Sequence, residues 1–291
     1  MQRRRTRGVY ERAVRSAARA LGLLLNLGVG AGLALGCGLG APALRAESGG
    51  LLERAVRGEA RVVDLTQPLA PGIPSYGGEG ETMRVETLTD LASDGYASGA
   101  FRVPEHYGTH VDAPGHFAAG GRTVDEIAPR RLLAPAVVID VRARVRQDPD
   151  HRLTPAEIEA WERSASIPDG AAVLLLTGWG ERFAGPADYR NVGDDGLMHF
   201  PGYSEAAVAY LLERRNVVAL GIDTLSIDHG PSHDFAAHRR SHAAGLYHVE
   251  NLANLASLPA RGAFVIVAPL PVVGGSGSPA RVLAIAPADS D

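Results

Sequence analysis

Short continuous apolar runs recur along the chain, separated by stretches rich in polar residues, glycine and proline. Runs of this kind between turn-forming residues are typical of strands that are buried on both faces. They predict buried strands at residues 136–141 and 171–177. Further strands are predicted at residues 61–65, 217–222, 263–269 and 280–286. Residues 83–89 alternate between apolar and polar positions instead, which predicts an edge strand.

Helical patterns lie between the predicted strands. Thr154 to Glu157 read TPAE, a capping box with proline at the first helical position, which predicts a helix ending near Ser164. Residues 204–215 are amphipathic at helical spacing and predict a second helix. Because strands alternate with helices, we expect an α/β fold, a mixed sheet with flanking helices. Residues 47–291 contain no long linker or internal repeat, so we expect them to form a single domain.

The first 46 residues follow a different pattern. Residues 1–19 are rich in arginine, residues 20–44 are apolar, and small residues follow. This order predicts a signal peptide over residues 1–46 and an exported protein, periplasmic or extracellular. Cys37 stands in LALGC, which loosely resembles a lipoprotein signal, so a lipid anchor at this cysteine is an alternative. Retention of the apolar run as a membrane anchor is a third alternative, weakened by its glycines.

Composition narrows the range of partners. The formal net charge is −4, and no basic tract occurs outside the first residues. Proteins that bind nucleic acid usually carry clustered positive charge, so we expect no nucleic acid partner. Hydrophobic residues make up 45% of the 291 residues, which is an ordinary content for a globular protein with a large core.

One segment concentrates residues that bind metals. Residues 106–116 read HYGTHVDAPGH and hold His106, His110, Asp112 and His116. Imidazole and carboxylate groups are common protein ligands for zinc and similar divalent ions. The alternative is a polar loop whose histidines contact water, but four such residues so close together favour half of a metal site.

The spacing within this segment predicts an extended chain. Its glycines, proline and β-branched residues disfavour a helix. In a strand, alternate side chains share a face, and the candidate ligands all occupy even positions. We therefore expect a strand over residues 101–111, a curl at Gly108 that brings His106 toward the other ligands, and an end of the strand at Pro114.

A second segment offers the rest of a metal site. The candidate ligands between residues 228 and 252 are His229, His233, His238, His242, His248 and Glu250. The spacing does not choose among them. If residues 245–249 form a strand, His248 and Glu250 lie on one face of it.

The first segment also resembles a known family. HYGTHVDAPGHF is similar to the HxGTHxDxPxHF signature of the metal-dependent cyclase family, which includes bacterial kynurenine formamidases and isatin hydrolases. VVDLTQPL, LLLTGW, GIDTLSIDHG and HVENLANL resemble other segments of that family, and the likeness extends from about Val62 to Ala286. The resemblance implies the family's swivelling β/β/α fold and an assembly as a homodimer or homotetramer.

The resemblance also implies roles for individual residues. It gives as metal ligands His106, His110, Asp112, His238 and Glu250. They would hold one or two divalent ions, zinc or manganese. His116 matches the family's catalytic histidine. Tyr76 stands where the formamidases tend to carry a substrate-binding tryptophan, which leaves an aromatic wall but weakens a role in hydrolysis of N-formylkynurenine.

These features predict a metal-dependent hydrolase that opens an amide, lactam or related carbonyl group of a small molecule. A divalent ion polarises carbonyl groups and lowers the pKa of water, and a histidine such as His116 can accept the water's proton and return it to the leaving group. One alternative is a metal-dependent lyase or cyclase that acts on a polyketide-like or lactone substrate. Another is an exported binding protein without catalytic activity.

Overall fold

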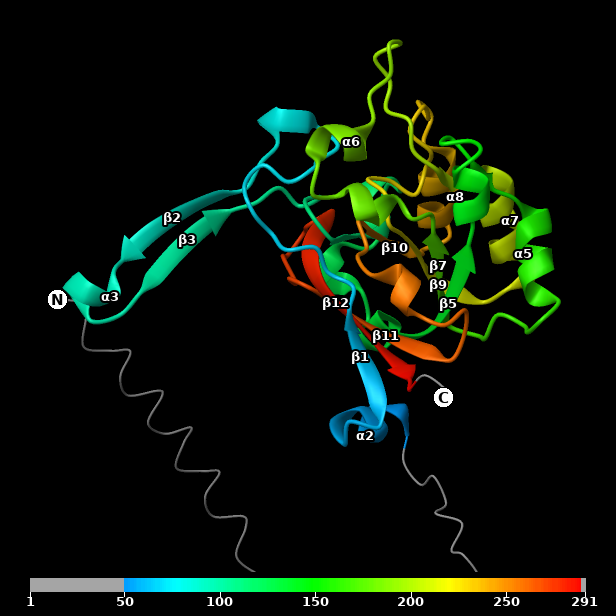
Figure 1. Ribbon diagram of the computed structural model, residues 1–291, viewed down its shortest axis with the longest axis horizontal. Helices are drawn as coiled ribbons and strands as arrows, with labels where there is room; N and C mark the ends of the chain where they lie inside the picture. Colours follow the sequence, from blue (N-terminus) through cyan, green and yellow to red (C-terminus); the bar gives the residue numbers. More distant parts are fainter. Residues whose placement is uncertain (1–49, 289–291) are drawn as a thin grey trace, which may run out of the picture. The chain divides into compact units, whose positions relative to one another are not determined.

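An eight-stranded mixed sheet forms the centre of the computed structural model, which describes residues 50–288 (Figure 1). In spatial order its strands are β1 (Ala60–Asp64), β12 (Gly277–Pro287), β11 (Ala263–Pro269), β5 (Leu133–Asp140), β7 (Ala171–Leu176), β9 (Val217–Ile222), β10 (Tyr247–Glu250) and β4 (His110–Asp112). The pairings among β5, β7, β9 and β10 are parallel, and the other pairings are antiparallel. The predicted signal peptide, including Cys37, lies outside the described residues.

The sheet closes on itself. The first residues of β12 pair with β4, while the rest of β12 pairs with β11 and β1. Seven strands therefore form a ring, and β1 lies outside it along β12. The predicted mixed α/β fold is confirmed, but the closure into a barrel-like sheet was not expected from the sequence.

Residues on the two faces of the strands form two separate cores, as their alternation requires. Ala136, Val138 and Leu174 point into the barrel and pack with residues of β11 and β12. Val137 and Leu175 point outward and pack against the helices. The outer layer consists of α5 (Pro155–Glu162), α7 (Glu205–Arg214) and α8 (Ala236–Ala243) (Figure 1).

The remaining elements are short. The other helices are α2 (Leu51–Val56), α3 (Leu91–Asp94), α4 (Arg142–Val145) and α6 (Pro186–Arg190). Two further two-stranded sheets consist of β2 (Arg84–Thr89) with β3 (Ser98–Arg102) and of β6 (Arg152–Leu153) with β8 (Gly202–Tyr203). No helix among residues 50–288 is long and apolar enough to cross a membrane.

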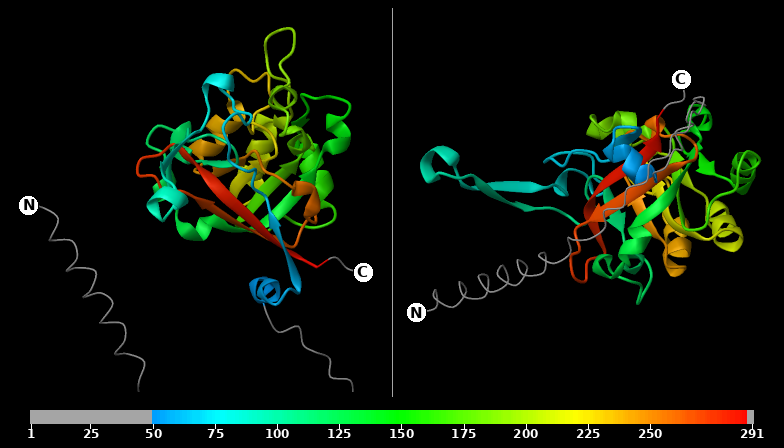
Figure 2. Two further views of the ribbon diagram at one scale, coloured as in Figure 1. Left: turned by 60° about the vertical axis from the view of Figure 1, so that its left-hand side comes forward. Right: turned by 90° about the horizontal axis from the view of Figure 1, so that it is seen from below.

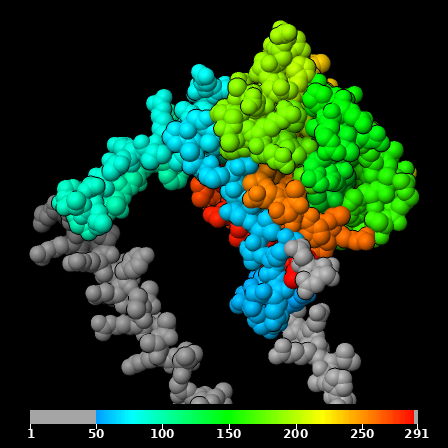
Figure 3. Space-filling model, viewed as in Figure 1, coloured from blue at the N-terminus to red at the C-terminus, as the bar shows by residue number. Residues whose placement is uncertain are grey.

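The β2–β3 hairpin extends away from the barrel, with α3 at its tip (Figure 2). The space-filling view shows it as an arm that stands clear of the rest of residues 50–288 (Figure 3). We call residues 84–102 the arm. The predicted edge strand at residues 83–89 is confirmed as β2.

The predicted strand over residues 101–111 is wrong. β3 ends at Arg102, residues 103–109 are not in a strand, and β4 begins only at His110. Pro104 lacks the N–H group that a sheet ladder needs. Gly108 adopts a left-handed conformation with φ of 64°, and a Cβ atom there would lie 2.6 Å from Leu69 Cδ2. The expected curl at Gly108 is therefore present, but within a loop.

Candidate metal centre

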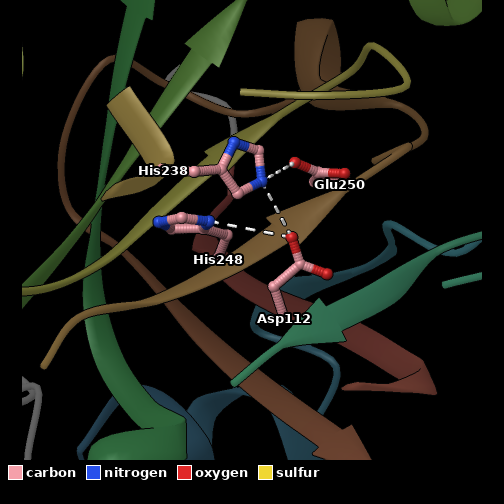
Figure 4. A group of neighbouring side chains, drawn as sticks. All are labelled: Asp112, His238, His248 and Glu250. Atoms are coloured by element: carbon pink, nitrogen blue, oxygen red, sulfur yellow. Dashed lines mark hydrogen bonds and ion pairs between the residues drawn. The ribbon is translucent and has the colours of Figure 1, made fainter. Parts of the chain in front are cut away.

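Four side chains of the centre come from two neighbouring strands. In the antiparallel pair of β4 and β10, Asp112 lies opposite His248 and His110 lies opposite Glu250. Side chains of directly opposed residues project from the same face of a sheet. All four side chains are buried, and they lie close together (Figure 4 shows three of them).

Helix α8 supplies His238 to the same cluster. Its Nε2 atom lies 3.1 Å from Asp112 Oδ2 and 3.3 Å from Glu250 Oε1 (Figure 4). Its Nδ1 atom lies 2.6 Å from Asp228 Oδ2. The Asp228 carboxylate also accepts hydrogen bonds from the backbone N–H groups of Ala237 and His238, at the N-terminus of α8. Asp228 therefore fixes both the helix end and the ring that it carries.

The loop before β4 brings His106 to the other side of Asp112. His106 Nδ1 lies 2.6 Å from Asp112 Oδ1, and its Nε2 lies 2.9 Å from Ser276 Oγ. His110 Nε2 lies 3.1 Å from the same Oδ1 atom and 3.5 Å from Glu250 Oε2. His110 Nδ1 bonds the carbonyl oxygen of Gly108, which directs Nε2 toward the carboxylates.

These buried charges shift one another's pKa values. Burial opposes the charged form of Asp112, but His110 and His106 hold its pKa well below the usual range. Burial would lower the pKa of His110, but Asp112 raises it to about 9. Burial and the charge of Asp112 raise the pKa of Glu250. Protons on imidazoles thus balance the buried carboxylates.

The donor set fits a divalent cation. Imidazole nitrogens and carboxylate oxygens surround a common centre, and the outer nitrogens of His110 and His238 are bound to a carbonyl oxygen and to Asp228. Such outer partners orient the rings of metal-binding histidines. A dication can replace the protons that balance the carboxylates, because metal binding releases protons from its ligands.

His116 lies beside the cluster at the end of a short 3₁₀ helix, Pro114–His116. Its ring stacks on that of His106, with 4.0 Å between the centroids, while its outer edge is exposed. Burial against the cluster removes water from the ring and lowers the pKa of His116 to about 4. The negative charge of Asp112 opposes this shift, and the charge of His106 adds to it. The imidazole is therefore neutral at pH 7 and can accept a proton.

A cavity of about 340 Å³ opens above the cluster. Tyr76, Phe117 and Phe235 line one side of it, and the Phe235 ring lies 5.3 Å from Phe117 and 6.1 Å from Tyr76. Phe235 has a φ angle of 50°, a left-handed conformation that is rare for a bulky residue. Strain of this kind is typical of residues held in place at binding sites.

Comparison with known proteins places the chain in a family. The family model described as "Putative cyclase" matches residues 63–229. The chain belongs to the cyclase family. Isatin hydrolase of Roseibium aggregatum is 35% identical over 256 residues, which cover 82% of this chain and 96% of that protein. Kynurenine formamidase of Geobacillus thermodenitrificans is 29% identical over 223 residues, covering 75% and 94% of the two chains.

A solved structure gives the same result. Isatin hydrolase A from Ralstonia solanacearum superposes with a TM-score of 0.77 at 38% identity, over 86% of this chain and all of that chain. The predicted family and fold class are thus confirmed. The predicted enzyme class is confirmed as well: the protein is an amide-opening, metal-dependent hydrolase of the cyclase family.

The structure brings together every site residue that the family resemblance implied. The five predicted ligands lie around one centre, and His116 and Tyr76 line the same cavity. Their roles as ligands, catalyst and substrate contact stay predictions. Among the other candidates, His248 joins the cluster and His242 stacks on it. Two groups of side chains among the described residues have ligand atoms close enough to hold one ion: Asp112, His238, His248 and Glu250 form one, and His106, Asp112 and His116 form the other. His229 and His233 lie outside both groups.

Two residues of the site were missed in the sequence. Asp228 stands ten positions before His238, and this spacing by itself gives no sign of contact. Only the helix start at Ala236 places the two side chains together. Phe235 gave no signal, because its role depends on a backbone conformation that aromatic residues seldom adopt.

Proposed function

We propose that the protein hydrolyses the lactam C–N bond of isatin or a closely related aryl lactam, with zinc or manganese as its metal. The observation that carries this proposal is the cavity in which three aromatic rings lie above a buried group of imidazoles and carboxylates. Relatives named as isatin hydrolases, which share 35% and 38% of their residues with this chain, support it.

The metal would be held by the imidazoles of His106, His110 and His238 together with the carboxylates of Asp112 and Glu250. When bound, a divalent cation polarises the carbonyl group and lowers the pKa of water. Because the five side chains are almost all buried, the protein presents them already in place, and little rearrangement is needed.

His116 acts as the general base and then as the general acid. Its neutral ring takes a proton from water as the water oxygen forms a bond to the carbonyl carbon. The same ring returns that proton to the lactam nitrogen as the C–N bond breaks. The products of isatin hydrolysis by this route are a carboxylate and a free aryl amine in one molecule.

The aromatic wall selects planar substrates. Tyr76, Phe117 and Phe235 offer ring faces and edges to a fused aromatic ring, and such pairs favour offset or edge-to-face contact. Tyr76 is partly exposed and also offers a hydroxyl group at the mouth of the cavity. These contacts fix the lactam carbonyl over the imidazole and carboxylate cluster.

The test is turnover by full-length protein that has been purified without chelators and analysed for metal content. We expect loss of isatin absorbance, faster than hydrolysis of N-formylkynurenine, and loss of activity after chelation that zinc or manganese restores. In ¹⁸O-labelled water the label should enter the carboxylate product, because hydrolysis joins the water oxygen to the carbonyl carbon. A lyase or cyclase would not incorporate the label. Metal-loaded protein that leaves isatin and related lactams unchanged would refute the proposal.

We also propose that the protein is exported and that it forms a homodimer or homotetramer. The arginine-rich start and apolar run of residues 1–46 support export, either with cleavage of a signal peptide or with a lipid at Cys37. Cell fractionation and mass determination of the mature protein distinguish these two outcomes. Exposed apolar side chains on the arm support self-association.

A further inference from the structure

His248 is buried beside the predicted ligands with one ring nitrogen unsatisfied. Its side chain has no solvent exposure. Its Nε2 atom lies 2.7 Å from Ser241 Oγ, whereas Nδ1 has no hydrogen-bond partner among the described residues. Nδ1 faces Asp112 Oδ2 at 3.7 Å, which is too long for a hydrogen bond (Figure 4).

The neighbours of His248 determine which nitrogen carries the proton. The Ser241 hydroxyl donates to the carbonyl oxygen of Ala237 at 2.6 Å, so its oxygen must accept from His248 Nε2–H. A neutral imidazole has one N–H group and one lone pair. The lone pair of His248 therefore lies on Nδ1, directed at the cluster, and leaving it unsatisfied destabilises the fold.

The two carboxylates divide the cluster into two halves. Asp112 Oδ1 and Glu250 Oε2 face His110, at 3.1 and 3.5 Å from its Nε2 atom. Asp112 Oδ2 and Glu250 Oε1 face His238, at 3.1 and 3.3 Å from its Nε2 atom. His106 adds a second imidazole to the first half. In the second half, the only comparable nitrogen among the described residues is Nδ1 of His248.

We propose that His248 is a metal ligand, an addition to the ligand set that the family resemblance implies. It binds the second of the one or two ions implied there, together with His238, Asp112 and Glu250. Atoms that bind one ion at about 2.0–2.2 Å lie roughly 3–3.6 Å from one another. In the second half, the separations of 3.1 and 3.3 Å lie within that range and the separation of 3.7 Å lies just above it. Two imidazoles and two carboxylate oxygens suit zinc or manganese.

His242 supports this arrangement from behind. Its ring stacks on the ring of His248, with centroids 3.9 Å apart and planes 13° from parallel. The stack holds the His248 ring in plane and keeps water from its outer face. His242 itself lies outside the ligand groups found among the described residues. It is therefore a matched control: an equally buried histidine, in contact with His248, whose removal leaves the ligand set intact.

The experiment measures metal binding by full-length protein without substrate. The variants are His248→Phe, which keeps a ring but no nitrogen, and His242→Phe. We expect two ions per chain for the wild type and for His242→Phe, by elemental analysis and by titration calorimetry with zinc and manganese. His248→Phe should retain one ion and lose at least about 10-fold in affinity for the second, because loss of only an outer partner of a ligand already costs about 10–100-fold.

Cobalt(II) loading gives a second readout, because its visible absorption depends on the number and type of ligands. His248→Gln keeps the size and polarity of the side chain and serves if His248→Phe does not fold. A changed cobalt spectrum in either variant supports ligation by His248. Stoichiometry, affinity and spectrum all equal to those of the wild type would overturn the proposal.

This inference rests on the metal dependence of the proposed function, but the two can fail separately. Metal binding is measured without turnover, so a protein that binds two ions and ignores isatin would refute only the substrate. A wild type that binds a single ion and loses no affinity in His248→Phe would refute the role of His248 and leave hydrolysis by the remaining ligands intact.

Discussion

His116 differs from the neighbouring histidines in its surroundings. The rings of His110 and His238 are buried and are held on both nitrogens by carboxylates or a carbonyl oxygen. His116 keeps an exposed edge at the cavity and stacks on His106. Because burial lowers its pKa to about 4, its ring is neutral at pH 7 and one ring nitrogen carries a lone pair.

Replacing His116 by alanine should therefore reduce kcat by about 10²-fold or more while leaving the metal content unchanged. Steady-state kinetics with isatin and elemental analysis of the same preparation measure the two quantities. His233→Ala, at an exposed histidine outside the cluster, is the control and should match the wild type. Loss of metal in His116→Ala would show that this residue is a ligand instead.

Asp228 acts through His238. Its carboxylate accepts one hydrogen bond from the ring and two from the start of α8. Replacing Asp228 by alanine frees the ring to rotate, so we expect metal affinity to fall by about 10–100-fold. Calorimetric titration measures this effect. Asp228→Asn keeps an oxygen acceptor without the charge and should lie between alanine and the wild type. Equal affinities in all three proteins would contradict the positioning role.

At the scale of elements, the sequence predicted the strands that are buried on both faces. Continuous apolar runs identified β5 and β7, because a strand with two covered faces lacks polar positions. The capping box at Thr154 correctly placed the start of α5. These features depend on neighbouring residues, and a single sequence contains that information.

The ring closure and the shape of the first ligand segment could not be predicted in the same way. β4 has only three residues, and it pairs with β10 and β12, which are more than a hundred residues away. Such short pairings leave no periodicity in the sequence. The family signature nevertheless pointed to side chains that the structure brings together, because it depends on residue spacing and does not require His106 to lie in a strand.

Ion pairs of His199 stabilise the loop after α6, and their strength depends on pH. His199 Nδ1 lies 2.6 Å from Asp150 Oδ2, and Nε2 lies 3.2 Å from both oxygens of Asp195. Hydrogen bonds to these two carboxylates raise the pKa of His199 above its usual 6.5. The stabilisation is therefore complete below pH 6.5 and is lost as the pH rises through the raised pKa.

His199→Gln should consequently destabilise the protein more at about pH 6 than at about pH 9. Urea denaturation of both proteins at the two pH values gives the difference in unfolding free energy. His233→Gln, at an exposed histidine, should show no such pH-dependent difference. If His199→Gln lowered the unfolding free energy more at about pH 9 than at about pH 6, the stabilisation could not come from a charged His199.

At the scale of the whole molecule, the arm exposes more apolar surface than an isolated hairpin tolerates. Five large apolar side chains on it are between 56% and 68% exposed, and they are Val85, Leu88, Leu91, Tyr96 and Phe101. Two-stranded hairpins are marginally stable in water unless another element covers them. In the proposed homodimer or homotetramer, a second copy of the chain would cover these side chains.

Adding charge to the arm should therefore weaken self-association. We expect Leu91→Asp combined with Phe101→Asp to shift the protein toward a monomer, as measured by light scattering coupled to size-exclusion chromatography. Val56→Asp, on α2 at a position that is 82% exposed, is the control and should keep the wild-type mass. A wild-type mass for the arm variant at every concentration would exclude the arm as the contact.

The position of β4 between β10 and β12 also governs biosynthesis. The ribosome adds His110 and Asp112 to the chain long before it adds Gly277, the residue of β12 that pairs with Asp112. A nascent chain therefore carries the first predicted ligands without either of the strands that hold them in register. A cation that needs the whole cluster would bind only after the chain has been made as far as Gly277.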